Sequence, residues 1–142
     1  MAQHLALTSI LVSDYDSAID YYVNKLGFEL LEDTPTVQSA NPALAKRWVV
    51  VSPSASSQCA LLLAQASDDQ QRTRIGDQTG GRVFLFLYTD DFWRDYELYK
   101  SRGVKFVRGE PRKEVYGMVA VFQDVFGNLW DLIEPADGLK LS

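Results

Sequence analysis

The chain has 142 residues, of which 46% are apolar and 23% charged, and its net charge is −5. This composition suits a soluble globular domain with a hydrophobic core, and the negative charge argues against nucleic acid as a partner. A single cysteine, Cys59, excludes an internal disulfide, and no apolar run is long enough to cross a membrane, so we expect a cytoplasmic protein.

The first half of the chain predicts a strand, a helix and three further strands. Residues 5–13 have the apolar pattern of a buried strand. Asp14 or Asp16 is a candidate N-cap for a helix that ends at Gly27. Thr34-Pro35 is expected to end the strand that follows this helix. The three strands after the helix are predicted at residues 28–33, 48–52 and 59–64.

The second half of the chain repeats this order. Residues 65–81 are polar and end in two glycines, so we expect an irregular connection there. Asp90 or Asp91 is expected to cap a helix that ends at Gly103, and Pro111 is expected to follow the end of a strand. The four strands of this half are predicted at residues 83–88, 104–108, 115–122 and 129–133.

The two halves carry the same helix-capping and turn-forming residues 76 positions apart. The aspartate, glycine and proline at positions 14, 27 and 35 recur at positions 90, 103 and 111. A repeat of this length indicates one supersecondary unit used twice. We therefore predict an α+β fold of two βαβββ modules, about 5–64 and 82–135, joined by the linker 65–81 in one domain, 1–142. One helix would cover one face of each sheet, and the other faces would form a cupped sheet around a central cavity.

The repeated segments resemble the vicinal oxygen chelate superfamily, which includes glyoxalase I, extradiol dioxygenases, fosfomycin-modifying enzymes and bleomycin-resistance proteins. The resemblance covers about residues 5–135. Its most specific parts are Leu7–Asp14, Ala18–Tyr22, Leu26–Phe28, Gly103–Phe106, Phe122–Asp124 and Gly127-Asn128. The family hosts lyases, isomerases, transferases, oxygenases and drug-binding proteins that catalyse no reaction.

The resemblance implies a divalent metal, and its expected ligand positions can be located by counting. They fall at Leu7, at Phe84 or Arg82, within residues 60–64, and at Asp131. Only the last of these can bind a metal, whereas a catalytic zinc usually keeps three protein ligands. The single histidine, His4, lies three residues before Leu7 and therefore on the opposite face of the strand. We expect no metal and no other cofactor, with a divalent metal as the alternative.

Alternation along the strands predicts which side chains lie on the same face as the expected metal-ligand positions. They are Leu7, Ser9 and Leu11, then Arg82, Phe84 and Phe86, then Leu129, Asp131 and Ile133. Arg47 or Trp48 and Tyr116 or Met118 can be added from two further strands. The predicted ligand-binding residues are Ser9, Arg47, Trp48, Arg82, Phe84, Tyr116 and Asp131. Arg82 and Asp131 could bind opposite ends of a polar ligand, or they could pair with each other.

Three functional hypotheses follow. The first is a metal-independent small-molecule-binding protein of the bleomycin-resistance type that holds an apolar or aromatic ligand in the cavity. The alternative is a lyase or isomerase of the glyoxalase type that acts on a small carbonyl or hydroxy-acid substrate, with Asp131 as the general base. The third is a structural or regulatory partner protein, which would show a large exposed apolar patch. A homodimer is expected, because two-fold dimers are the commonest oligomers.

Overall fold

The computed structural model describes residues 2–42 and 44–137. Contacts between residues divide the chain into two compact units, Met1–Gln78 and Thr79–Ser142. Each unit contains one of the two predicted modules and is described by itself below.

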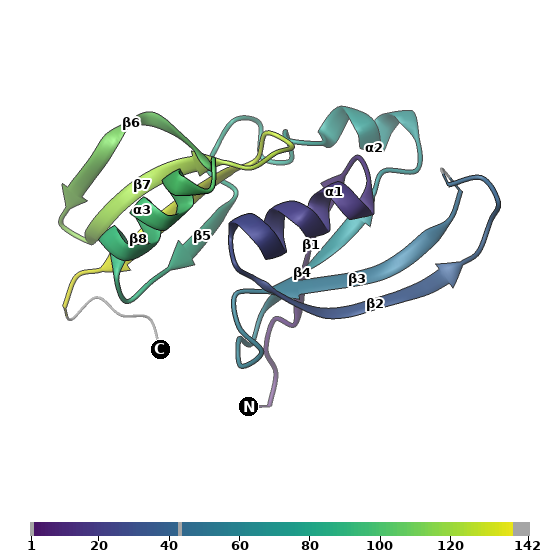
Figure 1. Cartoon of the computed structure of the whole chain (residues 1–142), viewed down its shortest axis with the longest axis horizontal. Coiled ribbons are helices and arrows are strands. Elements are labelled where there is room, and N and C mark those ends of the chain that lie inside the picture. Colours follow the sequence, from purple (N-terminus) through teal and green to yellow (C-terminus); the bar gives the residue numbers. More distant parts are fainter. Residues whose placement is uncertain (1, 43, 138–142) are drawn as a thin grey trace. The chain divides into compact units, whose positions relative to one another are not determined.

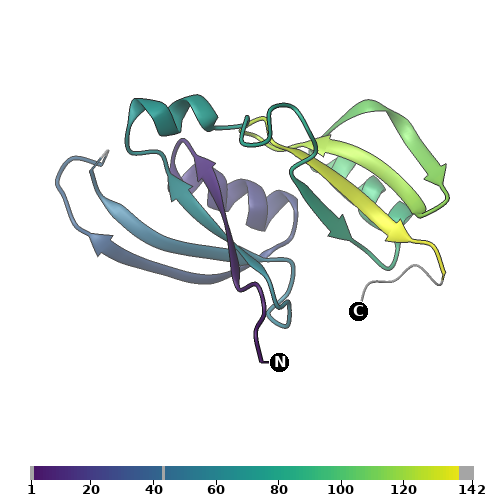
Figure 2. The ribbon, with the colours of Figure 1, turned by 180° about the vertical axis from the view of Figure 1, so that it is seen from behind.

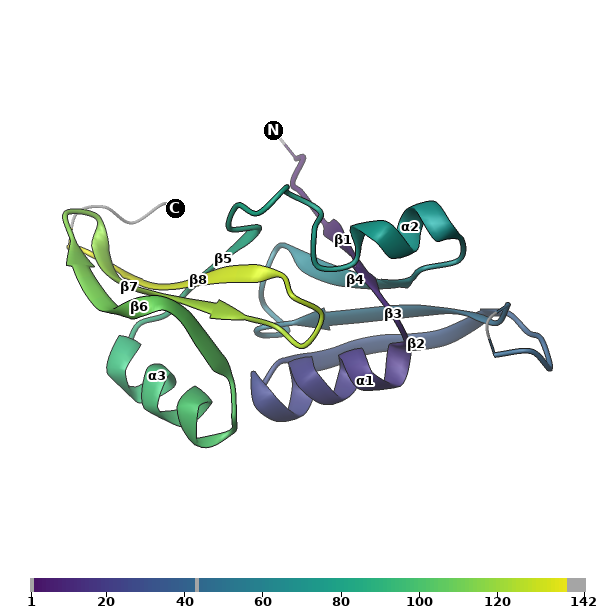
Figure 3. The same cartoon turned by 90° about the horizontal axis from the view of Figure 1, so that it is seen from above.

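The first module is a four-stranded sheet with a helix on one face (Figure 1). The strands lie in the order β1-β4-β3-β2, with β1 parallel to β4 and the other neighbours antiparallel. Figure 3 shows α1 on one side of this sheet and the short helix α2 on the other. Its elements are β1 (Leu7–Val12), α1 (Tyr15–Ile19) continued by a π-helix (Asp20–Lys25), β2 (Glu29–Val37), β3 (Lys46–Ser52), β4 (Ala60–Gln65) and α2 (Asp69–Arg74).

The second module repeats this topology. Its strands lie in the order β5-β8-β7-β6, with β5 parallel to β8. The elements are β5 (Leu85–Tyr88), α3 (Phe92–Ser101), β6 (Lys105–Glu114), β7 (Gly117–Gln123) and β8 (Leu129–Pro135). The α+β class and the two βαβββ modules predicted from the repeat are therefore confirmed.

The repeated aspartates and glycines lie at the ends of the helix of each module. Gly27 and Gly103 both have a positive φ, 76° and 82°, which a residue without a Cβ adopts at no steric cost. Asp14 caps α1 by accepting a hydrogen bond from Ser17 N–H at 2.8 Å. The cap of α3 is Asp91 and not Asp90, because it is Asp91 that accepts from the N–H of Arg94.

Each helix buries one face of its own sheet. In the first module, residues of alternating position on β1, β3 and β4 are fully buried: Ile10, Val12, Val49, Val51 and Leu63. In the second module, the Phe122 ring stacks on Trp130 at 5.6 Å and meets Tyr99 of α3 edge-on at 5.9 Å. Odd and even positions of each strand are thus divided between a helix-covered face and an opposite face, as the alternation predicted.

Two predicted strand ends are wrong. Both β2 and β6 continue past their prolines, Pro35 and Pro111. Each is an edge strand, where one side has no neighbouring strand. Proline is tolerated there because the N–H that it lacks would have no partner strand to bond. The register is irregular next to Pro35, and in β6 the four residues between Val107 and Arg112 lie opposite a single residue of β7.

The connection between the modules is also more ordered than predicted. Residues 69–74 form α2, whose N-cap Asp68 accepts a hydrogen bond from Gln71 N–H at 2.8 Å. This helix has no buried residue, so its sequence has no apolar stripe from which it could be predicted. No helix in the described part of the chain is long and apolar enough to span a membrane.

Candidate functional site

The face of the first sheet that α1 does not cover is called here the first open face. Strand register places Ser9 beside Leu62, and Leu62 beside Val50. Residues paired across neighbouring strands point to the same side of a sheet. Because Ile10 and Leu63 are buried on the helix-covered side, Ser9 and Leu62 point away from α1. Figure 2, from behind, shows β1 and β4 in front of that helix.

A groove of about 560 Å³ lies on the first open face. Apolar side chains of Leu11, Trp48 and Leu62 contribute to its lining. Its lining residues with polar groups are Ser9, Tyr15, Thr36, Lys46, Arg47, Gln65, Ser67 and Gln71. Gln71 belongs to α2 and Ser67 directly precedes its N-cap, so this helix forms one wall. An apolar depression with a few polar groups is the usual form of a small-molecule site.

Trp48 is the largest aromatic side chain in the groove. It is 40% exposed, although most tryptophans are largely buried. Its strand partner is Thr34 of the edge strand β2. The structure therefore brings the predicted residues Ser9 and Trp48 together in one groove and leaves an indole surface on which a flat ligand can stack.

The predicted ligand residue Arg47 also borders the groove, but its guanidinium is held by other side chains. It donates to both carboxylate oxygens of Asp33, at 3.0 and 2.7 Å, and to Asp16 at 2.9 Å. It also lies 5.1 Å from the centroid of the Tyr15 ring. All three guanidinium nitrogens are engaged, so Arg47 cross-links β2, β3 and the start of α1.

Replacing Asp33 with asparagine is expected to lower the free energy of unfolding by about 1 kcal/mol at neutral pH. The hydrogen bond from Arg47 lowers the pKa of Asp33 below its ordinary value. A lowered folded-state pKa gives stability that is present above the unfolded-state pKa and is lost as pH falls through the folded value. Urea unfolding should therefore separate wild type and Asp33→Asn at neutral pH and bring them together in acid.

The control for this prediction is Asp69→Asn. Asp69 forms an ion pair with Arg72 on the surface of α2, where its side chain is 97% exposed. Such a pair contributes only about 0.3 kcal/mol. Equal losses in the two variants would mean that the Arg47 cluster does not hold the edge strand.

The second open face, on the side of the second sheet away from α3, carries Asp131. The register pairs Asp131 with Val121 on one side and Phe86 on the other. Its neighbours along β8, Trp130 and Leu132, are buried on the side of α3. Asp131 is half-buried, and this burial raises its pKa, while Arg112 and Arg108 act in the opposite direction. Its predicted role as a general base stays a prediction.

Of the other predicted residues of the second module, Phe84 shares the face of Asp131, while Arg82 and Tyr116 lie outside the strands. Arg82 is exposed in a bend before β5 and forms no ion pair with Asp131 in the described part of the chain. Phe84 is half-buried and donates its N–H to Leu129 C=O at 2.8 Å. Tyr116 is in the turn before β7, not in the strand, and is 41% exposed.

Arg108 and Arg112 were missed because Pro111 was expected to follow a strand end. The continuation of β6 brings Arg112 opposite Val119. A signal was present, since proline within an alternating segment is typical of an edge strand. The cations whose charge acts on Asp131 are therefore these two arginines, and the described residues contain no ion pair between Arg82 and Asp131.

The donor set does not fit a divalent metal. In the described ranges 2–42 and 44–137, no three His, Cys, Asp or Glu side chains are placed to hold a metal ion. At the family's ligand positions, Leu7, Phe84 and residues 60–64 offer no donor side chain, and only Asp131 has a carboxylate. No reaction step through a metal is derived from these residues.

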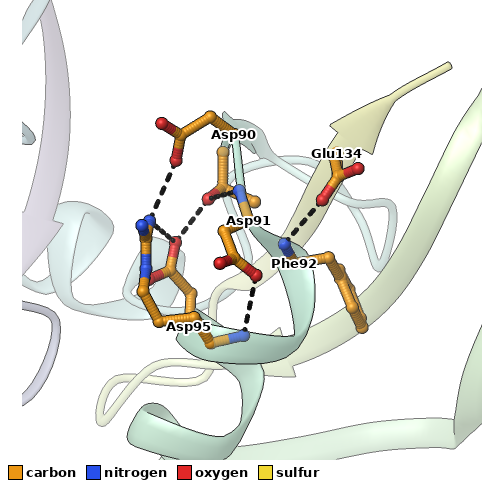
Figure 4. Close-up of polar contacts among 7 residues, drawn as sticks. Asp90, Asp91, Phe92, Asp95 and Glu134 are labelled. Carbon is orange, nitrogen blue, oxygen red and sulfur yellow. Dashed lines mark hydrogen bonds and ion pairs between the residues drawn. The ribbon is translucent and has the colours of Figure 1, made fainter. Parts of the chain in front are cut away.

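A second groove, of about 460 Å³, lies beside the start of α3. Figure 4 shows that one of its lining carboxylates serves the helix: Glu134 accepts the N–H of Phe92 at 2.8 Å. Asp91, which is outside the lining, accepts the N–H of Arg94. These contacts satisfy amides that an uncapped helix would leave unpaired. The groove on the first open face is therefore the better candidate for a ligand.

Comparison with known proteins gives the class of this protein. The model of the Glyoxalase/Bleomycin resistance protein/Dioxygenase superfamily matches residues 3–132. The chain therefore belongs to this superfamily, as its repeated segments indicated.

Individual relatives are similar along nearly the whole chain. An uncharacterized protein of Shewanella frigidimarina (strain NCIMB 400) is 54% identical, with 96% of this chain and 97% of that protein covered. The crystal structure of UcmS2 has a TM-score of 0.76 and 29% identity, and covers 94% of this chain and 99% of its own. The crystal structure of TnmS3, an antibiotic binding protein from Streptomyces sp. CB03234, has a TM-score of 0.74 and 32% identity, with 96% and 99% covered.

Proposed function

We propose that this protein binds a flat, apolar small molecule without the help of a metal, in the manner of a drug-sequestering member of its superfamily. The observation that carries the proposal is the groove on the first open face, where an exposed Trp48 lies beside Leu11 and Leu62. An exposed indole next to aliphatic side chains binds planar rings through apolar contact and stacking.

The relatives support the same class of function. TnmS3 is described as an antibiotic binding protein, and it is similar to this chain over both lengths. The positions that a metalloenzyme of the superfamily would use for metal ligands carry no donor side chain here, apart from Asp131. Burial of apolar surface, worth roughly 25 cal/mol per Å², would then supply most of the affinity. The ligand cavity predicted between the modules and the predicted homodimer both stay predictions.

A thermal-shift screen tests the proposal. Planar polycyclic aromatic compounds should raise the unfolding midpoint by roughly 5 °C or more at ~100-fold excess over Kd. The shifts should be the same with and without a chelator, because no metal takes part in binding. Sugars and linear dicarboxylic acids are the control ligands and should give no shift.

Two results of this screen would contradict the proposal. One is that no planar compound stabilises the protein while a polar control does. The other is that stabilisation appears only when a divalent metal is added and disappears with the chelator. The second result would favour the enzyme hypothesis instead.

A further inference from the structure

Asp131 stands out on the second open face because its carboxylate is half-buried and has no hydrogen bond to another described residue. Charged groups that lose water are normally hydrogen-bonded, because desolvation without a partner costs free energy. This carboxylate is therefore a strong acceptor directed at the side of the sheet that α3 does not cover. Other acidic residues of the module, such as Asp91 and Glu134, already accept backbone amides.

Two guanidinium groups from β6 lie near this carboxylate. Arg112 is paired with Val119, which is paired with Ile133, and Ile133 lies two residues along β8 from Asp131. The four side chains therefore share one face, with Arg112 and Asp131 two strands and two residues apart, or roughly 12 Å between backbones. An extended arginine side chain and an aspartate side chain together span most of that distance.

Arg108 belongs to the irregular part of β6, and its charge also acts on Asp131, lowering the pKa of that carboxyl. It has a positive φ of 61°, the only such value for a non-glycine residue in the described part of the chain. Its guanidinium donates to the Gly81 carbonyl at 2.7 Å, which holds the side chain in place. Strained backbone of this kind persists where the surrounding structure requires it and is found most often at functional sites.

The charges of this cluster decide which ligand group it suits. Arg112 also forms an ion pair with Glu114, with Nε 3.1 Å from Oε1. Two guanidinium groups and two carboxylates balance, so the cluster has no net preference for an anion or a cation. It offers a carboxylate acceptor beside guanidinium donors, and a neutral hydroxyl can satisfy both, since it donates one hydrogen bond and accepts another.

An aromatic surface adjoins this cluster. Phe86 is the strand partner of Asp131 and is 61% exposed. Two residues further along β5, Tyr88 is 48% exposed on the same face. A ring lying on Phe86 would bring its substituents next to the Asp131 carboxylate, because neighbouring strands are about 4.8 Å apart.

We infer that the second open face recognises a phenolic hydroxyl: the hydroxyl donates to Asp131 and accepts from Arg112 or Arg108, and its ring packs on Phe86. This inference rests on the proposed function for the class of ligand, a flat molecule with apolar rings, and adds a second binding surface, on the other module from the groove with Trp48, for hydroxylated aromatic molecules. A site built to hydrogen-bond a hydroxyl rejects an analogue that lacks it, because the buried polar groups are then left unpaired.

Calorimetric titration of the full chain with 7-hydroxycoumarin and 7-methoxycoumarin tests the inference. The two probes share a ring system, but the ether oxygen cannot donate. At a pH where the phenol is neutral, the hydroxyl compound should bind roughly tenfold more tightly than the ether. Asp131→Leu should reduce this preference to within about twofold without weakening the ether, and the isosteric Asp131→Asn should reduce it partially. The control Asp77→Asn, at an exposed aspartate of the first module, should keep the full preference.

Arg112→Gln distinguishes the hydrogen bond that the ligand oxygen accepts from the one that the hydroxyl donates to Asp131. It should weaken both probes, because both oxygens can accept from the guanidinium, whereas Asp131→Leu should weaken the hydroxyl compound alone. If both probes bind the wild type equally, the inference fails and the proposed function stands. If neither probe binds, the inference fails, and the thermal-shift screen decides the proposed function. A tenfold preference that survives in Asp131→Leu would also overturn the inference.

Discussion

Replacing Trp48 with alanine is expected to weaken the binding of planar aromatic ligands by roughly tenfold or more. Trp48 is the exposed aromatic side chain of the groove on the first open face, and Leu11 and Leu62 line the same groove. Removing the indole takes away both the stacking surface and much of the apolar area that a ligand would cover. The fold should be little affected, because a 40% exposed side chain contributes less to the core than a buried one.

Titration calorimetry with the strongest compound of the thermal-shift screen measures this effect. Trp48→Phe should retain most of the affinity, because phenylalanine keeps a flat aromatic surface. Trp93→Ala is the matched control, because Trp93 is also exposed, at 52%, but belongs to α3 of the other module. Equal losses of affinity in Trp48→Ala and Trp93→Ala would show that the groove is not the binding site.

Gly117→Ala is expected to lower the free energy of unfolding by about 2–4 kcal/mol. Gly117 begins β7 with a φ of 148°, where side chains are disfavoured. An added Cβ would lie 2.2 Å from the backbone oxygen of Glu134 and 3.1 Å from the nitrogen of Ala136. Backbone atoms paired in a sheet cannot move aside as a flexible side chain can. A displaced Glu134 would also lose its hydrogen bond to the start of α3 (Figure 4).

Chemical denaturation followed by circular dichroism measures the loss, and Gly109→Ala is its control. Gly109 has a φ of 91° but no atom within 4 Å of an added Cβ. This variant should therefore lower the free energy of unfolding by about 1 kcal/mol, the cost of the backbone conformation alone. If the two variants lose the same amount, the close approach of Gly117 to β8 has no energetic consequence.

The sequence predicted local structure best where a residue type has one main structural role. The glycines at positions 27 and 103 end their helices with positive φ, as their spacing predicted. The aspartates were less specific, because Asp90 and Asp91 are equivalent as a sequence signal. The hydrogen bond to Arg94 shows that the second of them is the cap.

The candidate site was predictable only in part. Ser9 and Trp48 lie on the predicted face and line one groove, because alternation along a strand does not depend on the rest of the fold. Arg47 borders the same groove, yet Asp33 and Asp16 engage its guanidinium. An arginine that cross-links strands looks the same in a sequence as one that awaits a ligand, so only its neighbours in space could separate the two roles.

The sequence by itself determined the two βαβββ modules and the superfamily, since these depend on residue types and their spacing along the chain. It also showed that Asp131 is the one donor at the superfamily's counted ligand positions. Only the tertiary structure decided that β2 and β6 are edge strands that continue past Pro35 and Pro111. Strand order depends on pairing between distant segments, and proline is tolerated or excluded according to that order. The same pairing placed Arg112 on the face of Asp131, because contacts across a sheet are set by register and not by distance along the chain.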